Sequence, residues 1–97
     1  MLAVVLCPTP PGLLCDAQHR PYFLWDCNVT LPELRAFLTS GDDDQRAYWV
    51  AKLMRQAKPD DALVIAGADE MRRLWPRIGP TLGRTRAFWE WYLEWAR

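Results

Sequence analysis

Histidine is nearly absent from this sequence, and its scarcity removes most catalytic arrangements. A Cys–His or Ser–His pair would have to use His19, which has no glycine-rich elbow beside it. The sequence also lacks a P-loop, a dinucleotide fingerprint and any glycine run that could cradle a phosphate. Carboxylates cluster at residues 42–44 and at Glu90 and Glu94, patterns that are typical of a helix start and of a solvent-facing helix stripe. We therefore expect no enzymatic activity and no cofactor.

Cysteine is also too sparse and too irregularly spaced to build a metal site. Cys7, Cys15, Cys27 and His19 are suitable ligand types for zinc, but no Cys-x-x-Cys or closely spaced His pair exists among them. An odd number of cysteines fits poorly with a disulfide framework. We expect no bound metal.

Long apolar runs and an excess of one charge are missing as well. No run approaches the ~20 residues needed to span a bilayer, and residues 1–6 are too short for the apolar core of a signal peptide. The expected location is the cytoplasm, where the thiols would be reduced. The 12 basic and 12 acidic residues cancel, which argues against strong nonspecific attraction to nucleic acid or to an anionic membrane.

The remaining pattern predicts one mostly α domain, a compact bundle of four to five short helices over residues 21–97, after an extended or disordered arm over residues 1–20. Three prolines between Cys7 and Gly12 argue against a helix or a central strand there. A short β-like strand at Ala3–Leu6 followed by a turn is the alternative. Helices are expected at about residues 30–39, 42–58, 60–66 and 68–75, and from residue 84 onward.

Helix-start chemistry and apolar spacing support these boundaries. Thr30 and Glu33 form a capping-box pattern. Pro59 marks the start of the third helix and Gly67 marks its end. Asp26 is expected to cap or hydrogen-bond a neighbouring backbone group, with a partner-facing carboxylate as the alternative. The expected core consists of Phe23, Trp25, Leu34, Phe37, Trp49, Leu53, Leu74, Phe88, Tyr92 and Trp95.

Tryptophan is what the sequence has in excess, with 6 Trp among 97 residues. The last helix is apolar almost all round, interrupted only by a stripe of Arg86, Glu90, Glu94 and Arg97. Such a helix must be buried on several sides, and this short chain has little else to cover it. Because Trp, Tyr and Arg are enriched at binding hot spots, we predict a non-enzymatic protein-binding module. Its expected partner-binding residues are Trp25, Trp89, Trp91 and Trp95.

Two other interpretations remain open. A homodimer could use the last helix as its seam. A small DNA-binding regulator could use the segments at residues 60–66 and 68–75 as a helix-turn-helix, with Arg72, Arg73 and Arg77 facing the DNA. Asp69 and Glu70 oppose the second interpretation, because they would repel phosphate at the start of the recognition helix.

The sequence resembles a group of small, mostly uncharacterised bacterial proteins, which begin near an aromatic-Trp-Asp motif and end in a Trp-rich helix. The resemblance is carried by residues 21–26 (PYFLWD), by the helix with Tyr48, Trp49 and Leu53, and by residues 86–95 (RAFWEWYLEW). The genes of this group often lie beside abortive-infection-type nucleotidyltransferase genes. The resemblance therefore implies an antitoxin-like or accessory protein whose partner is a nucleotidyltransferase-type toxin.

The resemblance covers residues 21–95 and carries over no catalytic residue. Two features depart from the pattern. The proline- and cysteine-containing arm before Arg20 is not part of it, and Gly83 stands where a hydroxylated helix cap is more usual.

Overall fold

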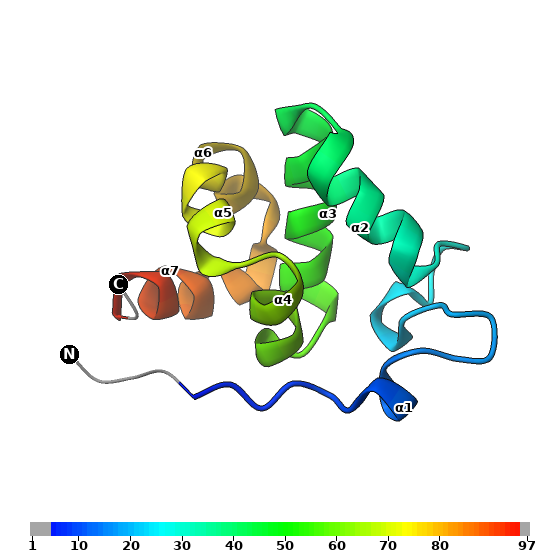
Figure 1. The fold of residues 1–97 in the computed structure, drawn as a ribbon. Helices are drawn as coiled ribbons and strands as arrows, with labels where there is room; N and C mark the ends of the chain where they lie inside the picture. The colour runs from blue at the N-terminus through cyan, green and yellow to red at the C-terminus, as the bar shows by residue number, and fades with distance from the viewer. Residues whose placement is uncertain (1–4, 96–97) are drawn as a thin grey trace.

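Capping side chains set the start of two of the long helices. In the computed structural model, which describes residues 5–95, α2 covers Leu31–Ser40 and α3 covers Asp43–Gln56. The Thr30 hydroxyl accepts a hydrogen bond from the Glu33 backbone N–H (3.3 Å), and the Glu33 carboxylate accepts one from the Thr30 N–H (3.0 Å). Asp42 accepts from the Gln45 N–H (2.8 Å) at the start of α3. Both expected helix starts are confirmed, and α2 packs against α3 (Figure 1).

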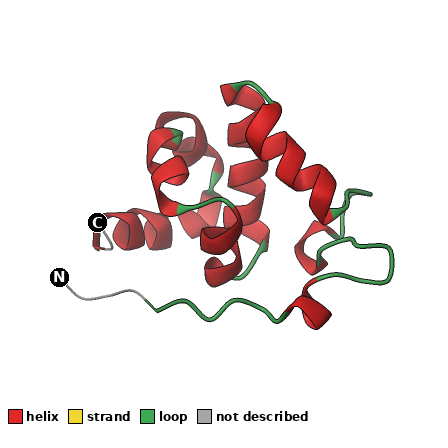
Figure 2. Cartoon of the chain, viewed as in Figure 1, coloured by secondary structure: helices red, strands yellow, loops and turns green. Residues whose placement is uncertain are grey.

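Five further helices and three 3₁₀ turns complete the described part of the chain (Figure 2). Their bounds are α1 Pro11–Leu14, η1 Tyr22–Leu24, α4 Pro59–Ile65, α5 Ala68–Arg73, α6 Trp75–Ile78, η2 Gly79–Thr81, η3 Gly83–Thr85 and α7 Arg86–Trp95. No strand occurs among residues 5–95. The Cα radius of gyration is 13.1 Å, close to the ~12.5 Å expected of a compact chain of this length. The mostly α, compact fold is confirmed.

The helix expected at about residues 68–75 begins at Ala68, as expected, but ends two residues early, at Arg73. Leu74 has φ −93° and ψ 4°, outside the helical range, and it separates α5 from α6. Pro76 explains the break, because a proline in a helix interior lacks the N–H donor and clashes with the carbonyl four residues before it. In α6 the same proline lies in the first turn, where its missing donor is harmless.

The core surrounds α3, which lies centrally in Figure 1. Among the expected core residues, Phe23, Leu34, Leu53 and Leu74 are buried, whereas Phe37, Trp49 and Tyr92 are partly buried. The expectation is wrong for Trp25, Phe88 and Trp95, whose exposed fractions are 71%, 39% and 52%. The core also contains buried residues that were not expected there, among them Met71, Ile78, Leu82 and Trp89.

The arm is extended over residues 5–10, as expected, and it is held against the start of α4. Asp61 is 2% exposed and accepts hydrogen bonds from the Thr9 N–H and hydroxyl and from the Tyr22 hydroxyl, each at 2.6 Å. Asp60 accepts from the Cys7 N–H at 2.7 Å. Burial raises the pKa of Asp61, but the hydrogen bonds that Thr9 and Tyr22 donate outweigh it, so the pKa lies below its usual range.

One detail of the arm differs from expectation, and another falls partly outside residues 5–95. The single helical turn α1 begins within the proline-rich stretch, because Pro11 lies at a first-turn position where no N–H is required. The alternative strand at Ala3–Leu6 lies partly outside the described residues, and Val5 and Leu6 are not in a strand.

Asp26 contacts side chains of α3 rather than capping a backbone group. Its Oδ2 accepts a hydrogen bond from the ammonium of the buried Lys52 at 2.6 Å. Gln56 donates to the Phe23 carbonyl at 2.7 Å and fixes the adjoining turn. The hydrogen bond from Lys52 holds the pKa of Asp26 below its usual range, against a smaller effect of desolvation.

The structure can be compared with the expectations about membrane-spanning helices and metal sites only within residues 5–95. There, no helix is long and apolar enough to cross a membrane. Within the same residues, no cluster of three or more His, Cys, Asp or Glu side chains could hold a metal ion. Cys7, Cys15 and Cys27 are free thiols.

Candidate protein-binding surface on the last helix

The inner side of α7 is anchored by Trp89 and Leu93, which lie one turn apart and are both buried. Trp89 is 1% exposed, and its indole N–H donates to the Met54 carbonyl at 2.9 Å. The Lys58 N–H, which would continue the α3 ladder to Met54, donates instead to the Tyr22 hydroxyl. Trp89 thus supplies the donor that the end of α3 lacks.

Arg72 of α5 fixes the other end of α7. Its Nη2 and Nε donate to the Leu93 carbonyl at 3.0 and 3.3 Å. A groove of about 330 Å³ opens beside this contact and is lined by Arg72, Trp75, Glu90, Leu93 and Glu94. The orientation of α7 is therefore determined by specific hydrogen bonds at two points of the helix.

The outer side of α7 carries three exposed aromatic rings, which we call the aromatic face: Phe88, Trp91 and Trp95. Their exposed fractions are 39%, 56% and 52%, and their spacing of three and four residues places them on one side of the helix. Trp91 and Trp95 stack with centroids 5.8 Å apart and planes at 10°, and Phe88 lies 6.1 Å from Trp91. The half-buried Tyr92 extends this cluster toward the core.

The three rings of the aromatic face together form one contiguous apolar patch. Aromatic side chains have ~150–250 Å² of surface to bury, so three rings exposed to this extent present on the order of 300 Å² of contiguous apolar area. That is comparable with the largest apolar patch of a typical monomer, which is often functional. Arg86 and Glu90 of the same helix pair at 3.3 Å, and both side chains are exposed.

The four tryptophans expected to bind a partner do not lie together. Trp91 and Trp95 form the aromatic face, but the assignment of Trp89 is wrong, because its ring is enclosed in the core. Trp25 is exposed, yet it directly follows η1, which lies on the opposite side of the molecule from α7 (Figure 1). Phe88 was missed as a surface residue. The signal that could have found it is its spacing to Trp91 and Trp95.

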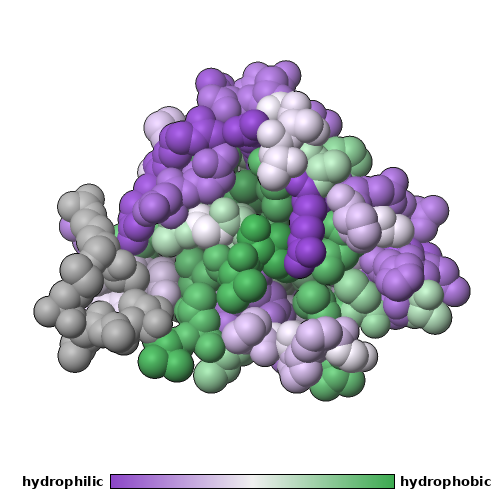
Figure 3. Space-filling model, in the orientation of Figure 1, coloured by the Kyte–Doolittle hydropathy of each residue, from purple (hydrophilic) through white to green (hydrophobic). Residues whose placement is uncertain are grey.

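Apolar residues also gather near the middle of the face drawn in Figure 3, over α4. Val64 of α4 is exposed, and the neighbouring Ile65 is partly buried. Scattered exposed aliphatic residues are normal on protein surfaces. The aromatic face of α7 differs because its three rings adjoin one another.

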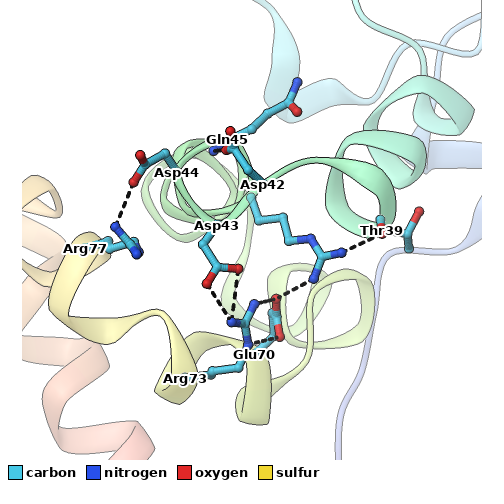
Figure 4. Close-up of polar contacts among 9 residues, drawn as sticks. Thr39, Asp42, Asp43, Asp44, Gln45, Glu70, Arg73 and Arg77 are labelled. Carbon is cyan, nitrogen blue, oxygen red and sulfur yellow. Dashed lines mark hydrogen bonds and ion pairs between the residues drawn. The ribbon is translucent and has the colours of Figure 1, made fainter.

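The arginines proposed for DNA binding all face carboxylates. Figure 4 shows Arg73 between Asp43 and Glu70, at 3.1 and 2.6 Å, and Arg77 beside Asp44 at 2.8 Å. The hydrogen bonds to Glu70 and then to Asp43 hold the pKa of Arg73 above its usual range.

Arg72 completes this set, because its guanidinium pairs with Asp69 at 3.2 Å. The candidate recognition helix α5 spans only six residues. The positive charge that a phosphate backbone would need is therefore largely compensated inside the molecule.

No protein-family model, curated protein or solved structure matches this chain.

Proposed function

We propose that this protein is a non-enzymatic protein-binding module whose partner covers the aromatic face of α7. The observation that carries the proposal is the contiguous exposure of Phe88, Trp91 and Trp95. Covering such rings removes apolar surface from water at ~25 cal/mol per Å², and fully desolvated Trp side chains are frequent hot spots. An interface centred on these rings would have the aromatic core that is typical of protein complexes.

The rigidity of α7 supports the same role. The bond from Trp89 to α3 and the bonds from Arg72 to the Leu93 carbonyl hold the helix in place before any partner arrives. A preorganised surface loses less conformational entropy on association. The partner that the resemblance implies is a nucleotidyltransferase-type toxin, which gives the protein an antitoxin-like role.

Co-expression with the product of the neighbouring gene, followed by purification and calorimetry, tests the proposal. We expect Trp91→Ala to weaken the complex by roughly 30-fold or more, since a hot spot contributes ~2 kcal/mol and each ~1.4 kcal/mol is tenfold. Trp25→Ala is the matched control, because Trp25 is exposed on the opposite side. It should leave the affinity unchanged.

Three results would count against this role. The neighbour could fail to bind and keep its activity in the presence of this protein. Both variants could bind as tightly as the wild type. Light scattering could show a concentration-dependent doubling of mass that Trp91→Ala abolishes, which would assign the aromatic face to a second copy of the chain.

A further inference from the structure

A second groove, of about 350 Å³, lies between α3 and the α6–η2 segment. Residues 44, 47, 48, 51 and 55 line it from one side of α3, at the spacing of successive helical turns, while Arg77 and Thr81 line it from the other side. It shares no lining residue with the aromatic face of α7. Its volume falls at the lower end of the range for small-molecule sites.

The groove holds two guanidinium groups and only one carboxylate. Arg55 Nη1 donates to the carbonyl and hydroxyl oxygens of Thr81 at 3.3 and 3.5 Å. Within residues 5–95, the hydrogen-bond partners of Arg55 are therefore uncharged. Arg77 pairs with Asp44 at 2.8 Å, and both side chains are largely exposed. Arg55 is therefore the guanidinium of this groove that an anion can approach without displacing a carboxylate.

The apolar lining is suited to a flat ring. Ala47 and Ala51 are buried, and as lining residues they present nothing larger than methyl groups. Tyr48 stands beside them, 55% exposed, and its ring is held edge-to-face against Trp49 with centroids 5.1 Å apart and planes at 88°. An aromatic side chain fixed in this way is a platform on which a base can stack.

We propose that this groove binds a nucleoside monophosphate, with the phosphate at Arg55 and the base against Tyr48. Guanidinium groups bind phosphate through paired N–H···O hydrogen bonds, a geometry that matches Arg better than Lys. The groove is sized for one ring and one phosphate rather than for a nucleic-acid strand. This inference is independent of the protein-binding role proposed for α7.

The experiment is a titration of the isotope-labelled full chain with AMP, followed by NMR of the backbone amides and the arginine Nε–H groups. Adenosine, which lacks the phosphate, and inorganic phosphate, which lacks the ring, are the comparison ligands. We expect AMP to shift the signals of the groove residues at millimolar concentration or below. Each comparison ligand should bind at least tenfold more weakly.

Two variants locate the site. Arg55→Gln should weaken AMP binding tenfold or more and leave the rest of the spectrum unchanged, because Arg55 is exposed and makes only long hydrogen bonds. Arg35→Gln, at an exposed arginine of α2 outside the groove, should bind AMP like the wild type. The proposal is overturned if AMP leaves the groove signals unmoved, if Arg55→Gln binds AMP as well as the wild type does, or if phosphate alone binds as tightly as AMP.

Discussion

Replacing Trp89 and Trp91 separately with alanine tests the division of α7 into a buried side and an exposed side. The two residues are of the same type and lie two positions apart, but their exposed fractions are 1% and 56%. Truncating a fully buried aromatic residue costs ~3–5 kcal/mol, and it also removes the donor that Trp89 provides to the Met54 carbonyl. Truncating Trp91 loses only a half-exposed stack on Trp95, worth ~0.5–1 kcal/mol.

The first cost is a large fraction of the total stability of such a domain, and the second is a small one. A domain of this length is stable by ~5–15 kcal/mol, and each 1 kcal/mol shifts its melting temperature by about 4–8 °C. We therefore expect Trp89→Ala to melt at least ~12 °C below the wild type, or to be unfolded at ambient temperature. Trp91→Ala should remain within about 8 °C of the wild type.

Thermal and urea unfolding of the full chain, followed by far-ultraviolet circular dichroism, measures both effects. Circular dichroism reports the helices directly, and it avoids the mixed fluorescence of several tryptophans. The reasoning is refuted if Trp91→Ala loses as much stability as Trp89→Ala, or if Trp89→Ala melts within a few degrees of the wild type. Either result would mean that α7 presents a different side to the core.

Two further predictions concern buried charge. Asp26→Asn should destabilise the protein at neutral pH, because it leaves the buried Lys52 ammonium without its counterion. Since the folded-state pKa of Asp26 is lowered, its contribution is present above the ordinary aspartate pKa of ~3.9 and is lost as pH falls through the folded-state value. The difference in unfolding free energy between variant and wild type should therefore shrink on acidification, and a difference independent of pH would contradict this. Asp61→Asn should lower the free energy of unfolding by ~1–3 kcal/mol and speed hydrogen exchange at the Thr9 amide. The control Asp60→Asn, at a more exposed contact, should leave the Thr9 amide protected. Equal exchange rates at Thr9 in both variants would show that Asp61 does not hold the arm.

Local chemistry accounts for the features that the sequence predicts correctly. The Thr30–Glu33 box and the Asp42 cap need only neighbouring residues to form. Gly67 follows the same logic, because its φ of +90° is a conformation that residues with a side chain rarely adopt. Such signals set helix starts and ends without reference to the rest of the fold.

The distribution of residues between core and surface depends instead on long-range packing. The periodicity of α7 is ambiguous, since five of its ten residues carry an aromatic ring and these are spread around the helix. Its leucine, Leu93, marks the buried side together with Trp89 one turn earlier. No local sequence pattern predicts the attachment of the arm either, because Thr9 and Asp61 lie 52 residues apart.

The pairing of arginines with carboxylates restricts the kinds of partner that the protein surface can bind. Asp43 and Glu70 compensate Arg73, and Asp44 pairs with Arg77, so the helices that resemble a DNA-binding motif offer little net positive charge. The aromatic face offers the opposite chemistry, because it consists of stacked, uncharged rings. Burial of apolar area is non-directional and does not depend on counterion release. A partner for α7 must therefore present an apolar surface of matching shape, and a polyanion is poorly suited to it.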